Sequence, residues 1–350
     1  MDRHTRNKAH IAPLRAAQYD FTEDGVRAAM GVVFAHDAIF RLCHPFGETE
    51  GPDAFYDAAY ASLFRAMPDL ERRDWMVLAG QTDRGDDWVG CGGHYVGTFA
   101  APWLDIPPTG HIATMRFHEF FRIAEGRVVE FQAIWDIPEL MMQAGAWPMA
   151  PSLGREMTVP APAAGDGVVA GPRDGETSRI SCLQVMDMLT HLKRHPGQGG
   201  PEVMEMERFW HPNMMWYGPA GIGSSRGIRG FRDWHQIPFV NAMPDRGQYG
   251  EEILYHFFGD GPYVAVTGWP NMIQSITHPG WMGISPQGKK TTMKSLDFWR
   301  LEDGLIRENW VLVDLLDIYH QIDVDPLARM REFNKARHGF DPETGQADGV

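Results

Sequence analysis

The pattern of hydrophobic and polar positions changes along the chain, and it predicts helices before strands in each half. Residues 21–70 contain amphipathic segments that favour helices. From residue 75 to 136 the pattern changes to β-branched and aromatic runs separated by glycines, which is typical of long antiparallel strands. The second half repeats this order, with helices expected at 181–195 and 203–212 and strands from about residue 251. This order predicts α+β domains in which helices cover one face of a bent sheet and enclose a cavity.

The clearest local signal is a β-hairpin that occurs once in each half. Two strand-like segments flank the turn at residues 124–126, and a matching pair flanks residues 302–304. Both turns contain a glycine that follows an acidic residue, and this pairing favours a tight reversal between antiparallel strands.

The pattern repeats because the sequence itself repeats. Twelve positions between residues 103 and 143 recur with the same residue 178 positions later, so that Asp136 matches Asp314 and Trp103 matches Trp281. Upstream of this window the offset is 176. A period of this length indicates a duplicated domain, since the repeats of solenoid proteins are several times shorter.

The length of 350 residues also agrees with two domains. Between the copies lies a stretch rich in Pro, Gly and Ala, which is typical of a linker. We therefore expect an N-terminal arm at 1–20, a first domain at 21–148, a linker at 149–178, a second domain at 179–325, and a C-terminal helix and tail at 326–350.

Composition narrows the classes of partner. The formal charge of −14 disfavours nucleic acid, because phosphate binding needs clustered Lys and Arg. Three cysteines far apart favour a reducing compartment, and no run of residues has the length of a membrane span or of a signal peptide. We expect a soluble cytoplasmic protein without a membrane partner. The 12 Trp, 19 Phe and 20 Met suit a hydrophobic or aromatic small molecule.

Matching motifs in the two halves lie at residues 105–110, 120–130, 283–290, 297–304 and 308–314. These segments resemble the SnoaL-like polyketide cyclase family, which belongs to the nuclear transport factor 2-like superfamily. The resemblance covers about 20–145 and 180–325. It implies two tandem cone-shaped α+β barrels of the cystatin-like or nuclear transport factor 2-like kind, packed as two subunits would be.

The resemblance also implies where catalysis takes place. Members of the family are implied to use one Asp as acid and base for an aldol-type ring closure, at the point where the last strand meets the closing helix. In this chain that position is occupied by Asp136 and Asp314. A carboxylate in an apolar cavity has a raised pKa, which suits it to remove a proton next to a carbonyl. The alternative is that both residues cap helices, with Pro138 strengthening the cap at Asp136.

Histidines are the next candidates for catalysis. His278 matches a position of the family where histidine occurs, and His118 lies on the hairpin strand of the first copy, where its counterpart is Leu296. Each could polarise a substrate oxygen or could be an ordinary hydrogen-bonded histidine. The residues expected to contact a substrate are His94, Tyr95, Trp103, Gln132, His235, Trp281, Asn309 and Trp310.

Two further charged positions recur in both copies. Glu119 and Asp297 share one repeat position, and Arg122 and Arg300 share another. We interpret them as structural ion pairs across the hairpin.

The leading hypothesis is a cofactor-independent lyase or cyclase that removes a proton next to the carbonyl of a hydrophobic, aromatic or polyketide-like molecule. The chain lacks a phosphate-binding glycine loop and the common zinc and nucleophile motifs, so we expect neither a cofactor nor a metal. A dehydratase, an isomerase and a non-catalytic ligand-binding protein remain alternatives. The two copies are expected to form an intramolecular pseudo-dimer, and association into a homodimer is left open.

Overall fold

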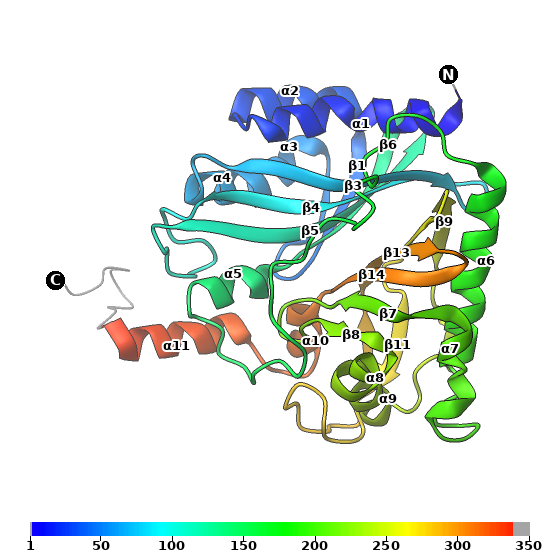
Figure 1. Cartoon of the computed structure of the whole chain (residues 1–350). Helices are drawn as coiled ribbons and strands as arrows, with labels where there is room; N and C mark the ends of the chain where they lie inside the picture. Colours follow the sequence, from blue (N-terminus) through cyan, green and yellow to red (C-terminus); the bar gives the residue numbers. More distant parts are fainter. Residues whose placement is uncertain (1, 339–350) are drawn as a thin grey trace.

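The computed structural model describes residues 2–338, and within this range each half folds into a six-stranded sheet with helices (Figure 1). The first sheet has the order β2-β1-β6-β5-β4-β3, in which only β1 and β6 are parallel. Its strands are β1 Phe34–Leu42, β2 Gly47–Glu50, β3 Glu71–Gln81, β4 Asp87–Thr98, β5 Ile112–Ala124 and β6 Arg127–Trp135.

Helices cover one face of the first sheet, and the second half of the chain lies against the other face (Figure 1). These helices are α1 Arg3–Tyr19, α2 Glu23–Val33, α3 Pro52–Phe55, a π-helical turn Tyr56–Tyr60 and α4 Ala61–Ala66, while α5 Ile137–Gln143 follows the last strand. Together with the sheet they form the first cone.

The second half repeats the arrangement and forms the second cone. Its sheet has the order β8-β7-β14-β13-β10-β9, with β7 Trp210–Tyr217, β8 Ser225–Arg226, β9 His256–Asp260, β10 Tyr263–Thr267, β13 Ser295–Glu302 and β14 Leu305–Val313. A separate ribbon pairs β11 Met272–Ser275 with β12 Lys290–Met293. The helices are α6 Gly175–Leu192, α7 Met206–Phe209, α8 Gly227–Phe231, a π-helical turn Arg232–Gln236, α9 Ile237–Ala242, α10 Leu315–Gln321 and α11 Pro326–His338.

The expected fold of two tandem α+β barrels is therefore confirmed, whereas two of the expected helical segments end earlier than predicted and give way to a strand. The helix that begins the first cone ends at Val33, and the next residues form strand β1. Residues 203–212 contain only the single turn α7 before strand β7 begins at Trp210. Both missed strands pair in parallel with the last strand of their cone, a long-range pairing that a local hydrophobic pattern cannot reveal. The tail expected at 339–350 lies outside the described residues.

The predicted hairpins are confirmed, and their turns have the backbone that the sequence favours. Glu125 and Gly126 have φ of 50° and 75°, and Asp303 and Gly304 have φ of 51° and 77°. Positive φ at both central residues is the mark of a type I′ turn, whose twist matches that of the flanking strands. The glycines adopt this conformation without strain and the short side chain of Asp303 tolerates it, whereas Glu125 adopts it at a cost in backbone strain.

The two sheets pack face to face through equivalent residues. The ring of Phe120 stacks on that of Phe298, its own repeat counterpart, with centroids 5.1 Å apart. Beside them the Nδ1–H of His118 donates to the carbonyl of Leu296 at 2.6 Å. A Cβ at Gly90 would lie 2.9 Å from the Phe298 ring, so the absence of a side chain there permits the close approach. Contacts between a residue and its own counterpart are those of a two-fold interface.

The segment between the cones is ordered along this junction. The carbonyl of Pro160 accepts from Trp310 Nε1 at 3.0 Å, and the Gly167 carbonyl accepts from the backbone N–H of Val77 at 2.9 Å. At the N-terminal end of the chain, α1 packs against β3. Within the described range, no helix is long and apolar enough to cross a bilayer.

Candidate active site

The interior of the first cone is occupied by its own side chains. Arg72 and Glu119 are fully buried there and form an ion pair, with Nη1 and Oε2 2.5 Å apart. The hydroxyl of Tyr95 and the indole N–H of Trp135 also donate to Glu119, at 2.9 and 3.1 Å. This carboxylate is therefore paired with a cation and accepts hydrogen bonds from three side chains of its own cone.

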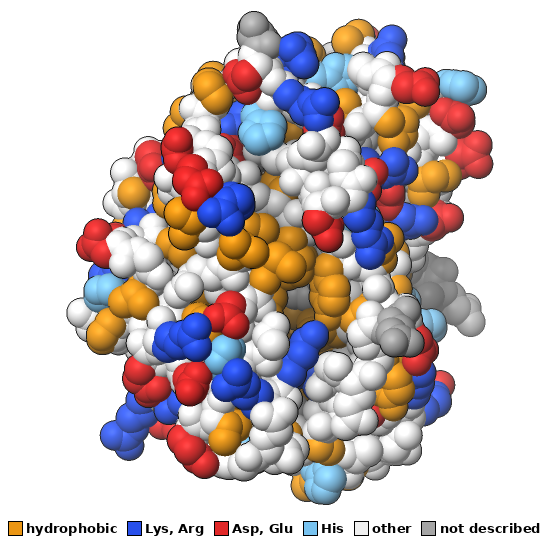
Figure 2. All heavy atoms as spheres, turned by 90° about the vertical axis from the view of Figure 1, so that its right-hand side faces the viewer, with side chains coloured by type: hydrophobic (Ala, Val, Ile, Leu, Met, Phe, Trp, Pro, Cys, Tyr) orange, Lys and Arg blue, Asp and Glu red, His pale blue; other side chains and the backbone are white. Residues whose placement is uncertain are grey.

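The second cone is hollow. Two adjoining cavities of about 220 and 120 Å³ lie on the inner face of its sheet, beneath α6 and the α8–α9 region. Their linings are mainly apolar, and Figure 2 shows a hollow bordered by hydrophobic side chains on this side of the molecule. Both cavities are bordered by Leu189, Arg246, Met272, Ser295, Asp297 and Trp299.

Strand length explains why the second cone is hollow at the place where Arg72 fills the first. Strand β3 has 11 residues. In its first part Arg72 pairs with Tyr95 on β4, and Tyr95 pairs on its other side with Met115 on β5. The counterpart of Met115 is Met293, which pairs with Met272 on β11. Within residues 2–338, β11 pairs with β12 alone, and β9 has only five residues. The second cone therefore has no strand at the position from which Arg72 fills the first cone, and its interior opens there.

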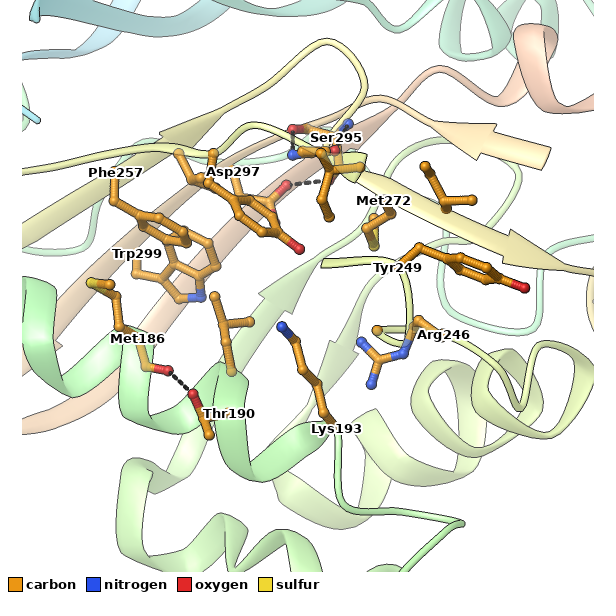
Figure 3. A pocket seen from close by; sticks show the side chains of 17 residues that line it. Met186, Thr190, Lys193, Arg246, Tyr249, Phe257, Met272, Ser295, Asp297 and Trp299 are labelled. Atoms are coloured by element: carbon orange, nitrogen blue, oxygen red, sulfur yellow. Dashed lines mark hydrogen bonds between the residues drawn. The ribbon is translucent and has the colours of Figure 1, made fainter. Parts of the chain in front are cut away.

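Asp297 lies in the wall of this cavity (Figure 3). It is the third residue of β13, and the alternation of the strand places Ser295 and Trp299 on the same face. Its Oδ1 accepts from Ser295 Oγ at 2.5 Å, but no Lys, Arg or His among the described side chains lies within 4.0 Å. Burial raises the pKa of Asp297 to about 7, and the Ser295 hydrogen bond only partly opposes this. Asp297 is thus an unpaired carboxyl at the repeat position of Glu119.

Polar groups with free hydrogen-bonding capacity surround the same cavity. Among the described side chains, the buried Nε1 atoms of Trp281 and Trp299 and the amide of Gln236 have no hydrogen-bond partner. His235 stacks on Trp216 with ring centroids 4.0 Å apart, and burial lowers its pKa to about 3, so the imidazole is neutral. Unpartnered buried donors are costly, and a ligand oxygen would satisfy them once a small rotation of these side chains turns the N–H groups toward the cavity.

Asp136, one of the two expected catalytic acids, lies at the junction between the cones. Its Oδ2 is 3.3 Å from Nη2 of Arg116 and accepts from the backbone N–H of Ala220 at 3.0 Å. Burial raises its pKa, which the Arg116 charge opposes. Although Asp136 begins α5, its side chain makes no cap hydrogen bond. It does not border either cavity of the second cone.

Asp314 occupies the equivalent position in the second half and is a helix cap. It accepts from the backbone N–H of Asp317 at 3.2 Å and from that of His44, in the first cone, at 3.0 Å. Lys294 Nζ lies 3.5 Å away. Burial nevertheless raises the pKa of Asp314 to about 6, because desolvation outweighs the opposing charge of Lys294 and the two backbone hydrogen bonds. Its contacts hold the two cones together, and it does not border the cavities.

The structure separates the two expected catalytic histidines from each other and from the cavity. His118 is buried between the sheets, where burial and the charge of Arg116 lower its pKa. His278 is exposed and hydrogen-bonds to the hydroxyl of Thr277 at 2.9 Å. Neither histidine borders the cavities of the second cone.

The residues expected to contact a substrate are divided among three places. Those that border the cavities of the second cone are His235, Trp281 and Asn309. Those inside the first half are Tyr95, bonded to Glu119, and Trp103, bonded to Ser62. The remaining three lie at or beside the junction between the cones. There His94 is hydrogen-bonded to Trp75, Gln132 to Thr267, and Trp310 to the carbonyl of Pro160.

The predicted ion pairs of Glu119 with Arg122 and of Asp297 with Arg300 are wrong, because each arginine pairs across its hairpin with a different acid. Arg300 binds Glu308, with Nε and Oε2 2.5 Å apart, and Arg122 binds Glu130 at 2.9 Å. Residues 297 and 300 are three apart on one strand and therefore point to opposite faces of the sheet. The same alternation groups Asp297 with Trp299 and could have placed this carboxyl on the cavity side from the sequence alone.

Comparisons with known proteins match each half of the chain separately. The family model described as SnoaL-like polyketide cyclase matches residues 14–144 and 201–322, which together exceed half of the chain. No curated protein matches the chain.

Solved structures with a similar chain each cover about one half of this protein. IdmH from Streptomyces antibioticus, described as a proposed polyketide cyclase, is 21% identical over 40% of this chain and 98% of its own, with a TM-score of 0.33. A proposed SnoaL-like polyketide cyclase from Jannaschia sp. CCS1 is 24% identical over 41% and 95%, with a TM-score of 0.33. An NTF2-like protein from Burkholderia thailandensis is 21% identical over 41% and 98%, with a TM-score of 0.31.

Proposed function

The chain belongs to the SnoaL-like polyketide cyclase family, and on that premise we propose that it is a cofactor-independent cyclase or lyase whose reaction takes place in the second cone. Asp297 is the proposed acid and base, and the substrate is a hydrophobic small molecule with a carbonyl group. One observation carries this proposal: Asp297 is a carboxyl without a basic partner among the described side chains, in the wall of a cavity lined largely by apolar residues.

The chemistry follows from the protonation state of Asp297. A group with a pKa of about 7 is about half ionised at neutral pH, which suits both removal and return of a proton. The carboxylate takes the proton next to a carbonyl, and the enolate oxygen accepts from the unpartnered N–H groups of Trp281, Trp299 or Gln236. The enolate carbon then bonds to a second carbonyl carbon, and the acid form of Asp297 protonates the resulting alkoxide. Run backwards, the same steps cleave the bond as a retro-aldol reaction.

The first cone is proposed to serve as the packing partner of the second. Its interior ion pair of Arg72 and Glu119 fills the space that a substrate would need. The stacking of Phe120 on Phe298 supports the interpretation of the chain as an internal pseudo-dimer. Asp136 and Asp314 would then be residues of this junction, because both bind groups of the opposite cone.

Deuterium exchange tests the proposal without knowledge of the natural substrate. Aryl ketones would be incubated with the protein in heavy water, and label at the carbon next to the carbonyl would be followed by mass spectrometry. We expect wild type to catalyse the exchange. In Asp297→Asn the exchange rate should fall by a factor of about 100 or more, as expected for the loss of a general base. Asp303→Asn is the matched control, because it makes the same change at an exposed turn of the same hairpin.

Two results would contradict this assignment. Retained exchange in Asp297→Asn together with loss in an Asp136→Asn/Asp314→Asn double variant would place the chemistry at the junction. Ketones that bind in the second cone but are not labelled by wild type would instead favour the alternative of a non-catalytic binding protein.

A further inference from the structure

Two cationic side chains border the larger of the two cavities, which we call the outer cavity; the smaller one is the inner cavity. Lys193 is the C-cap residue of α6, and Arg246 lies in the segment that follows α9. Figure 3 shows the Lys193 side chain extending from the end of α6 into the cavity, with the guanidinium of Arg246 on the same side. We propose that Lys193 and Arg246 form an anion subsite that holds a carboxylate of the substrate.

Neither cation is neutralised by the protein. Among the described side chains, no carboxylate oxygen lies within 4.0 Å of Lys193 or Arg246, whereas Lys290, which also lies in the second half, binds Glu252 at 2.9 Å. Arg246 donates from Nη2 to the carbonyl of Leu192 at 3.1 Å, while its buried Nε has no described partner. The bond to Leu192 holds the guanidinium at the cavity wall, and a planar guanidinium held in place can present its other N–H groups to a carboxylate.

Both cations lie in surroundings that disfavour their charged forms. Lys193 is exposed at one side, but the partial burial of its side chain lowers its pKa, and the positive charge of Arg246 lowers it further. Burial also lowers the pKa of Arg246. An anion between them would relieve both effects, because it supplies the opposite charge that favours the protonated forms. In a chain with a formal charge of −14, a pair of cations without a described acidic partner is best explained by an anionic ligand.

The position of the subsite sets the orientation of the ligand. Lys193 borders only the outer of the two cavities and Arg246 borders both, whereas aromatic side chains such as Trp216 and Phe239 line the smaller, inner one. A carboxylate would repel ionised Asp297, so it should bind at the cations and leave the apolar body beside Asp297. If Asp297 is the base, as proposed above, the substrate is an apolar carbonyl compound that carries a carboxylate at the end remote from the reacting carbon.

Two fluorescent probes test the subsite on the whole protein. The first is 1-anilinonaphthalene-8-sulfonate, and the second is N-phenyl-1-naphthylamine, which has the same aromatic body without the sulfonate. We expect the anionic probe to bind about tenfold more tightly, as a charge-assisted hydrogen bond predicts. Added 2-naphthoate should displace it, whereas methyl 2-naphthoate should do so about tenfold less well. Higher salt should weaken only the anionic probe.

Variants assign the effect to the two cations. Lys193→Gln and Arg246→Gln should each weaken binding of the anionic probe about tenfold and leave the neutral probe unchanged. Arg229→Gln, which removes the same charge from a side chain that is 95% exposed in the second half, should change neither. Ile253→Trp should weaken both probes, because Ile253 borders the outer cavity. Lys193 is exposed, so its replacement is expected to leave the fold intact, which melting curves would verify.

The results separate this inference from the assignment of the base. Equal affinity for the two probes, or anionic binding unchanged in both Lys193→Gln and Arg246→Gln, would overturn the anion subsite. The role of Asp297 would be unaffected by that result, since it depends on deuterium exchange. Conversely, Asp297→Asn could bind the anionic probe as wild type does and still catalyse exchange. That result would support the anion subsite and rule out Asp297 as the base.

Discussion

Asp297 should make the stability of the protein depend on pH, and replacing it with Asn should remove that dependence. Burial raises the pKa of this carboxyl from 3.8 to about 7 in the folded protein. In the unfolded chain the group titrates near its ordinary value of about 3.9. One unit of pKa corresponds to about 1.36 kcal/mol, so ionising Asp297 in the folded state costs up to about 4 kcal/mol above about pH 7.

The direction follows from which state binds the proton. The folded protein holds it more tightly, so the contribution to stability is fully present below about pH 4 and is lost as the pH rises through about 7. From about pH 5 to about pH 8.5, wild type should lose about 3 kcal/mol more unfolding free energy than Asp297→Asn. Water in the cavity, to which Asp297 is partly exposed, would reduce this to about 2 kcal/mol.

Urea unfolding followed by tryptophan fluorescence would measure this difference at the two pH values. Other titrating groups are shared by wild type and Asp297→Asn, so their effects cancel in the comparison. Asp303→Asn should behave as wild type, because it removes an exposed carboxyl. If Asp297→Asn lost as much stability as wild type, the carboxyl would have an ordinary pKa, and the reasoning that makes it a base at neutral pH would be refuted.

Two further predictions concern the first cone and the junction. Arg72→Met should cost about 3–5 kcal/mol of unfolding free energy, because it leaves Glu119 buried without its cation, yet probe binding in the second cone should persist while the protein is folded. Equal urea midpoints for Arg72→Met and wild type would contradict this. Gly90→Ala should cost about 1–3 kcal/mol, because its Cβ would lie 2.9 Å from the Phe298 ring. Gly171→Ala is the control, since its Cβ would meet no atom within 4 Å, and thermal melting of both variants would show whether the junction tolerates the methyl group.

Local signals in the sequence predicted the parts of the fold that depend on local chemistry. The turn at Glu125 and Gly126 was predictable because a glycine between two strand-like segments adopts positive φ without strain. Strand β1 was missed because it follows α2 without a break, and its principal partner, β6, lies about ninety residues further along the chain. Such a strand is stabilised by tertiary pairing that no local window contains.

The candidate site was predictable only in part. His235, Trp281 and Asn309 were expected to contact a substrate, and they do border the cavity. Asp297 was interpreted as part of an ion pair because Arg300 recurs with it, although strand alternation places the two on opposite faces. Asp314 was expected in the cavity, but packing of the cones engages it with His44 instead.

The sequence by itself determined that the protein is a duplication of one α+β unit with paired hairpins and a family resemblance in both halves. Repeats, turns and alternation are properties of neighbouring positions, so they are readable along the chain. Only the tertiary structure decided which copy is hollow. That difference depends on whether a distant strand brings a cation to the carboxyl: Arg72 reaches Glu119, whereas no described cation reaches Asp297. Burial without a partner, which raises the pKa of Asp297, is a property of the folded surroundings and not of the residue.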